Sequence, residues 1–303
     1  MTQGIQTFSI VVGTRACNAK CPFCVSRMTG FNEVLKKTGE INVKNFVKAA
    51  RLAQIAGTTT VLLTGKGEPT LYPEQITRYL DHLKAWNFPF IELQTNALEI
   101  GKIANGQQSK IKNLDVHMLR RWYELGLNTI AISVVSNRNE DNEKIYRKDY
   151  PNLAKTILLL REIGFTVRLC VMLVDGMIDN IDRLQEVVDF CKTTGADQLT
   201  IRPIRFPQSS LDDAVTNWTR AHAPSQQKID DITEWLDQEG TVLMTLTHGA
   251  KVYDLYGQNV CLADCLTVES DNSDIRTLIF YDDGRLTYDW QHKGGLLLSG
   301  NRK

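Results

Sequence analysis

Over its first 240 residues, the chain alternates short β-branched runs with longer stretches in which apolar residues recur at helical spacing. Runs of this length and composition are typical of strands. Six are present, at residues 8–14, 59–65, 90–97, 129–136, 166–175 and 198–204. Helical spacing is seen in the sets Ile76, Tyr79, Leu80 and Leu83, then Leu153, Ile157 and Leu160, then Ile181, Leu184, Val188 and Cys191. Each set gives a helix one apolar face that can cover a sheet.

Glycines mark the ends of the expected helices. Gly57, Gly126, Gly164 and Gly195 each follow a helical segment and precede a strand, where a left-handed C-cap residue is favoured. Six strand and helix units of this kind build a parallel sheet with right-handed crossovers. A complete eight-unit barrel typically takes about 250 residues, and six units here already occupy about 240. The sequence therefore predicts an α/β fold, an open, partial (βα)6 TIM-like barrel, and excludes sandwich and all-helical folds.

Two segments depart from the alternation. Residues 98–114 are polar and contain two glycines, so we expect a loop insertion after the third strand. From about residue 241 the alternation ends, and Asp283-Gly284 lies between two strand-like runs, a pattern typical of a β-hairpin. We therefore predict a barrel domain at residues 1–240 and a small α+β extension with a hairpin at residues 241–303.

The composition is that of an ordinary globular protein, with 303 residues and 35 basic against 35 acidic side chains. The net charge of zero argues against nucleic-acid binding through a strong basic field. The sequence contains no apolar run long enough to span a membrane and begins without the pattern of a secretory signal. Seven cysteines, three of them within residues 17–24, fit metal binding in a reducing compartment better than a disulfide framework. We therefore expect a cytoplasmic protein without membrane or nucleic-acid partners.

Cys17, Cys21 and Cys24 come directly after the first expected strand. With three and two residues between them, these thiolates can surround one iron–sulfur cube, each on a different iron, and leave the fourth iron without a protein ligand. The amino and carboxylate groups of S-adenosylmethionine (SAM) can chelate such an iron, and an electron from the cluster then breaks a C–S bond to give a 5'-deoxyadenosyl radical. Zinc is the alternative, but structural zinc sites normally close with four ligands, and the first histidine is His82.

The cysteine segment resembles the radical SAM superfamily, whose C-x3-C-x-aromatic-C motif is matched by Cys17, Cys21, Phe23 and Cys24. The resemblance covers about residues 7–205. It implies a [4Fe–4S] cluster on the three cysteines, SAM as the second cofactor, and Phe23 near the adenine.

Residues 64–69, TGKGEP, are similar to the family's Gly-Gly-Glu-Pro motif, with Lys66 between the two glycines. The resemblance implies that Gly65, Gly67 and Glu68 hold the methionine end of SAM. Glycine suits this task because it lets backbone carbonyls come close to a ligand ammonium. The alternative is an ordinary Gly-Pro turn.

Several expected strands carry polar residues on the face that the alternation turns inward, where a packed barrel would have Val or Ile. They are Glu92, Gln94, Asn96, Ser133, Arg168, Cys170, Thr200 and Arg202. This pattern predicts a wet interior filled by ligands. The resemblance implies SAM contacts at Asn96 and Ser133, although Ala97 replaces the glycine of the family's third-strand motif.

Inward arginines suit phosphate or carboxylate groups. We expect Arg202 to bind an anionic group of the cofactor or substrate, and Arg168 and Gln94 to be substrate ligands. The alternative for Arg202 is a structural ion pair with a strand neighbour such as Glu92.

The segment VRLCVMLVDGMIDNIDRLQEVVDF resembles the branch of molybdenum-cofactor GTP cyclases and peptide-modifying enzymes. The cyclase's second cluster uses three cysteines and its chain ends in Gly-Gly, but this chain has only Cys261 and Cys265 there and ends GNRK, so a GTP cyclase is not expected. We expect Cys261 and Cys265 to be reduced thiols, with an auxiliary metal site or a redox pair as alternatives. Tyr281, Tyr288 and Trp290 are expected to pack the C-terminal region rather than to stack on substrate.

Together these features predict an enzyme that cleaves SAM reductively and abstracts hydrogen from a nucleotide or other small anionic substrate. A reductant protein such as flavodoxin or ferredoxin is the expected electron donor. One alternative is modification of a ribosomally made peptide. An alternative of another class is a noncatalytic metal- or RNA-binding module, which would carry a basic and aromatic stripe that this sequence lacks.

Overall fold

The computed structural model describes residues 4–29, 39–146, 148–246, 249–263 and 275–300. All six predicted strands are present, and each pairs in parallel with the next. They are β1 (Thr7–Val11), β2 (Thr60–Thr64), β3 (Phe90–Thr95), β4 (Thr129–Val134), β5 (Thr166–Leu173) and β6 (Gln198–Pro203).

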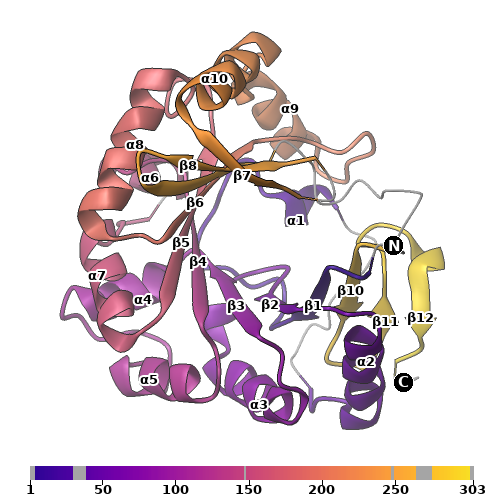
Figure 1. The fold of residues 1–303 in the computed structure, drawn as a ribbon. Helices are drawn as coiled ribbons and strands as arrows, with labels where there is room; N and C mark the ends of the chain where they lie inside the picture. Colours follow the sequence, from indigo (N-terminus) through magenta and orange to yellow (C-terminus); the bar gives the residue numbers. More distant parts are fainter. Residues whose placement is uncertain (1–3, 30–38, 147, 247–248, 264–274, 301–303) are drawn as a thin grey trace.

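Helices line the outside of this sheet (Figure 1). The longer ones along the parallel strands are α2 (Val43–Ile55), α3 (Pro73–Leu83), α5 (Val116–Glu124), α7 (Leu153–Ile163) and α8 (Ile181–Thr194). The others are α1 (Val25–Met28), α4 (Leu98–Ala104), α6 (Asn139–Tyr146), α9 (Asp213–His222) and α10 (Gln226–Glu239). Gly164 and Gly195 end α7 and α8 with φ values of 116° and 76°, the left-handed conformation predicted for them.

The C-terminal strands extend the same sheet at both edges. At one edge β9 (Gln258–Leu262) pairs in parallel with β6, followed by β8 (Lys251–Leu255) and β7 (Thr241–Thr245). At the other edge β10 (Thr277–Phe280) pairs in parallel with β1, followed by β11 (Leu286–Thr287) and β12 (Leu296–Leu298). The outer strands β7 and β12 are not paired with each other among the described residues, so the predicted open, partial barrel is confirmed (Figure 1).

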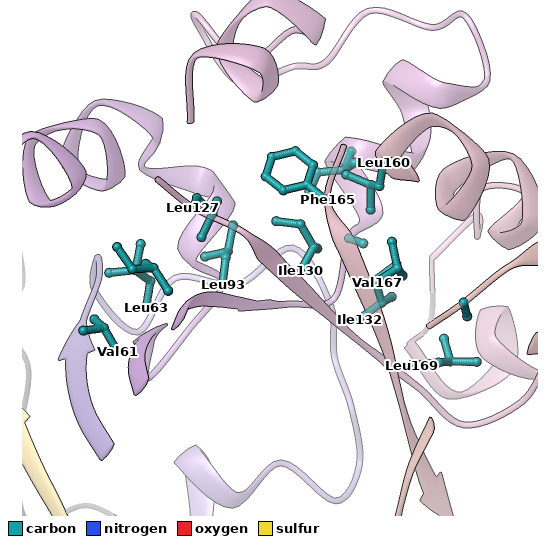
Figure 2. Close-up of a cluster of buried hydrophobic side chains, with 14 of the residues drawn as sticks. Val61, Leu63, Leu93, Leu127, Ile130, Ile132, Leu160, Phe165, Val167 and Leu169 are labelled. Carbon is teal, nitrogen blue, oxygen red and sulfur yellow. The ribbon is translucent and has the colours of Figure 1, made fainter. Parts of the chain in front are cut away.

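Aliphatic side chains pack between the sheet and its helices (Figure 2). Fully buried members from the strands are Val61, Leu63, Leu93, Ile130, Ile132, Val167 and Leu169. Cys191 of α8 is buried in the same cluster, as predicted. Full burial of side chains of this size contributes about 1.5–3 kcal/mol each. Because side chains alternate along a strand, the residues between these aliphatic positions face the barrel interior.

The predicted loop insertion at residues 98–114 is wrong in its first part. These residues begin with α4, in which Leu98 and Ile100 are buried. Gly101, which the sequence suggested as a loop residue, lies within the helix. A glycine is needed there because Pro151 packs against it and leaves no room for a side chain. A Cβ at this position would lie 2.2 Å from the proline Cγ.

The Asp283-Gly284 pair lies in the turn that joins β10 to β11, and Gly284 has a φ of 88°. Residues 241–300 thus add strands to both edges of the barrel. Among the described residues, no helix combines the length and apolar character needed to cross a bilayer.

Candidate active site

The cysteine loop, residues 12–24, connects β1 to α1 at the C-terminal end of β1. It carries three free thiols, of which Cys17 is exposed and Cys21 and Cys24 are half-buried. The loop is tied to the end of α6 by Lys20, whose N–H donates to the carbonyl of Tyr146 at 3.1 Å.

The donor set of this loop fits an iron–sulfur cube better than a single metal ion. Burial raises the pKa of Cys17 and of Cys21, and neighbouring thiolates raise both further, so a bound metal would favour their ionised forms. One zinc ion binds each sulfur at about 2.3 Å and draws its ligands into contact. Among the described residues, no three His, Cys, Asp or Glu side chains are grouped closely enough to hold an ion. In a cube each thiolate binds a different iron, so its ligands lie further apart.

The glycine loop, residues 64–68, lies directly against the cysteine loop. A Cβ at Gly67 would lie 2.1 Å from the carbonyl oxygen of Ala16, and a Cβ at Gly65 would lie 2.8 Å from another backbone carbonyl. The N–H of Glu68 donates to the Ala16 carbonyl at 3.0 Å. Only glycine permits so close an approach, because any side chain would collide with these carbonyls. The two glycines therefore allow the glycine loop and the cysteine loop to lie side by side.

Glu68 is buried, and donors of this chain surround its carboxylate. Oε1 accepts from the Thr70 N–H at 3.0 Å, the Thr70 hydroxyl at 2.6 Å and the Thr95 hydroxyl at 2.6 Å. Oε2 accepts from the Asn96 N–H at 2.9 Å. Burial raises the pKa of Glu68, and these hydrogen bonds oppose that shift. The carboxylate thereby joins the glycine loop to the end of β3, and its predicted contact with SAM stays a prediction.

Asn96 links the end of β3 to the cysteine loop. Its Nδ2 donates to Asn18 Oδ1 at 2.8 Å and to Cys17 Sγ at 3.8 Å. A hydrogen bond of this kind favours the thiolate. The following residue, Ala97, has a φ of 54°, which gives a physical reason for a glycine in the family's motif. Asn18 was missed because it occupies a variable position of the cysteine motif.

A row of polar side chains crosses the barrel interior. Strand register places Ser133, Cys170, Thr200 and Cys261 side by side on β4, β5, β6 and β9. They lie on the strand face opposite the aliphatic core, so the inward polar face expected from the alternation is present. Cys265 lies outside the described residues.

Arg168 forms an ion pair with Glu92 across the interior. Glu92 is 1% exposed and also accepts from Gln94 Nε2 at 3.1 Å. Both predicted substrate ligands therefore contact Glu92, and their contact with substrate stays a prediction. Among the described residues, the cation paired with Glu92 is Arg168 and not Arg202.

Arg202 is the inward arginine that has no carboxylate partner among the described residues. It lies opposite Met172 near the C-terminal end of β6. Its Nε is buried and has no hydrogen-bond partner. The residue as a whole is half-buried. A guanidinium partly withdrawn from water is stabilised by an anion, so this position suits an anionic ligand group.

Phe23 of the cysteine motif faces an aromatic residue that the sequence did not single out. The Phe23 and Trp218 rings are 6.0 Å apart, and Trp218 stacks on His222 at 3.9 Å. Arg27 pairs with Asp212 at 2.7 Å and so ties α1 to the start of α9. Trp218 carries no motif signal, because it lies on a helix after the last parallel strand of the predicted barrel.

Lys66 projects from the glycine loop toward the C-terminal strands. Its side chain is buried, and its Nζ lies 5.2 Å from the ring centre of Trp290. Burial and the nearby Arg15 lower the pKa of Lys66 to about 8, while Cys24 opposes the shift. Trp290 therefore packs on the glycine loop, which sequence reasoning did not predict.

Known proteins share a sequence pattern or a fold with this chain. A family model described as the radical SAM superfamily matches residues 11–191. No curated protein matches the chain by sequence. SuiB of Streptococcus suis, solved with its precursor peptide SuiA, is 16% identical with a TM-score of 0.59, over 94% of this chain and 59% of SuiB.

Two further solved structures are similar. The structure of native anSMEcpe with bound AdoMet is 13% identical, with a TM-score of 0.58 over 98% of this chain and 78% of its own. A radical SAM methyltransferase from Sphaerobacter thermophilus is 17% identical, with a TM-score of 0.50 over 76% of this chain and 63% of its own. These likenesses show a shared fold. The chain spans 59% of the length of SuiB.

The matched family region contains the cysteine loop, the glycine loop and β2 to β5, and it is more than half of the chain. The family's members use a [4Fe–4S] cluster and SAM. On this match, the chain belongs to the radical SAM superfamily.

Proposed function

We propose that this protein reductively cleaves SAM at a [4Fe–4S] cluster and abstracts hydrogen from a substrate inside the barrel. One observation carries the proposal: three segments distant in sequence, the cysteine loop, the glycine loop and the end of β3, are hydrogen-bonded to one another. They meet at the C-terminal ends of parallel strands, where sites in TIM-type barrels are built.

Each group of residues has a separate task in this proposal. Cys17, Cys21 and Cys24 hold the cluster, which when bound supplies the electron that cleaves SAM to a 5'-deoxyadenosyl radical. Gly65 and Gly67 let backbone carbonyls approach the SAM ammonium, and Glu68 fixes their loop. The remaining SAM ligands are Phe23, Asn96, Ser133 and Arg202.

Iron content tests the cluster assignment. Changing Cys17, Cys21 or Cys24 to Ala is expected to remove most of the about four iron atoms that one cube brings. Iron is measured per chain after anaerobic reconstitution. The double variant Cys261→Ala, Cys265→Ala is the control and should keep the iron, since two thiolates cannot complete a cube. Iron near the wild-type level in all three single variants would contradict the assignment.

For the substrate, we propose a nucleotide or other small anion, because Arg202 offers a guanidinium that no described carboxylate neutralises. Arg202→Met is expected to weaken binding of SAM or substrate by about 2 kcal/mol, roughly thirtyfold in affinity. Calorimetric titration with SAM measures this, and a melting curve checks the fold. Unchanged affinity with a lowered melting temperature would show that Arg202 has a structural role.

Modification of a peptide is the second candidate, and it is favoured by the similarity in fold to SuiB, which was solved with a precursor peptide. In either case an electron donor such as flavodoxin or ferredoxin is needed to reduce the cluster. A noncatalytic metal- or RNA-binding module would instead produce no 5'-deoxyadenosine after anaerobic reduction with SAM.

A further inference from the structure

Lys66 is a buried cation for which the described part of the chain provides no carboxylate partner. Its side chain is 7% exposed, and no carboxylate among the described residues pairs with it. The ring of Trp290 lies 5.2 Å from Nζ and stabilises its charge, whereas Arg15 repels it. An aromatic face offsets only part of the cost of burying an ammonium group. The surroundings of Lys66 therefore favour a negative charge close to Nζ.

The position of Lys66 identifies the source of that charge. Lys66 lies in the glycine loop, where the next residue, Gly67, touches the carbonyl of Ala16 and Glu68 donates its N–H to the same carbonyl, directly before Cys17. The charge of Cys24 acts favourably on Lys66. A cube with three thiolates has a net negative charge, and reduction adds one electron. A nearby cation in a buried, low-dielectric setting stabilises the reduced form more than the oxidised form.

The C-terminal strands hold this arrangement in place. Tyr281 follows β10 and packs with Val11 and Ile279, and Trp290 packs against the same cluster. Trp290, which lies between β11 and β12, is therefore held over Lys66, and Lys66 has little contact with water. Water would otherwise screen the effect of the ammonium on its surroundings.

We propose that Lys66 is a positioning residue that acts through the cluster, as a fixed positive charge that makes the cluster easier to reduce. This inference rests on the proposed cluster at Cys17, Cys21 and Cys24. Lys66 stands between the two glycines matched to the family's Gly-Gly-Glu-Pro motif, so the effect is a property of this chain's own sequence.

The test is a reductive titration of the anaerobically reconstituted protein, followed by electron paramagnetic resonance. Without SAM, Lys66→Met is expected to make reduction of the cluster roughly tenfold less favourable. For a one-electron couple this lowers the midpoint potential by about 59 mV. Lys66→Arg keeps the charge and should stay near the wild-type potential. Lys20→Met removes an exposed cation from the cysteine loop itself and is the matched control, expected to change the potential little.

Two outcomes would overturn the inference. One is an unchanged midpoint potential in Lys66→Met. The other is a shift that occurs only when SAM is present, because the anion would then be the SAM carboxylate. Iron content is measured in every sample, and Lys66→Gln is a second neutral variant if Lys66→Met fails to load. Wild-type protein without a reducible cluster would instead contradict the proposed function.

Discussion

At the scale of single residues, Glu68 holds the parts of the site together. Its carboxylate accepts hydrogen bonds from Thr70, just after the glycine loop, and from Thr95 and Asn96 at the end of β3. Glutamine has the same shape but one acceptor oxygen and an amide that donates. At least one of the buried donors around it would therefore lose its acceptor.

We expect Glu68→Gln to lower the free energy of unfolding by about 2 kcal/mol, the cost of losing hydrogen bonds to a buried charged group. Urea unfolding of the metal-free protein measures this. Glu74→Gln, at an exposed position, is the control and should change stability little. Equal stability of Glu68→Gln and wild type would show that the carboxylate is not needed to hold the loop.

Some of these residues could be predicted from sequence and others could not. The spacing of the three cysteines and the two loop glycines indicate chemistry by themselves, since few other residues fit those tasks. The partners of Arg168 and Arg202 could not be predicted, because alternation gives the direction of a side chain and not its neighbour across strands. The pairing of Arg168 with Glu92 depends on strand register.

At the scale of elements, the loop between β5 and α8 is fixed to α10 by Lys228 and Asp179. Asp179 also accepts from the Gly176 N–H at 3.0 Å. Burial alone would raise the pKa of Asp179, but the hydrogen bonds from Lys228 and Gly176 outweigh it and hold the pKa below its usual range. A carboxylate with a lowered pKa stabilises the folded state above its unfolded pKa, and this contribution falls as the pH drops through the folded pKa.

Asp179→Asn is therefore expected to be less stable than wild type at pH 7, and the difference should shrink as the pH falls below about 4. Chemical unfolding at several pH values measures the difference. The control is Asp175→Asn, which removes the more exposed partner of Lys228 and should have the smaller effect. A difference that stays constant down to pH 2 would contradict the role of the Asp179 charge.

Element prediction succeeded where periodicity and end signals agree, as for α7 and α8 with their C-terminal glycines. It failed at α4, where one glycine inside a short helix resembles a loop signal. The reason for that glycine is contact with Pro151, a residue from a later part of the chain. Local sequence carries no signal for such a contact.

At the scale of the whole molecule, the open parallel barrel follows from the repeated strand and helix units. The pairing of β10 with β1 and of β9 with β6 does not follow from these units, because it joins residues far apart in the sequence. The added strands matter for the site, since they bring Trp290 to the glycine loop and Cys261 to the interior row.

The central claim is that the cysteine loop supports reductive cleavage of SAM. The most direct measurement is 5'-deoxyadenosine formed by the anaerobically reconstituted, reduced protein in the presence of SAM. We predict product from the wild-type protein and none from Cys17→Ala, Cys21→Ala or Cys24→Ala. Absence of product from wild-type protein that contains about four iron atoms per chain, or equal product from the cysteine variants, would contradict the account.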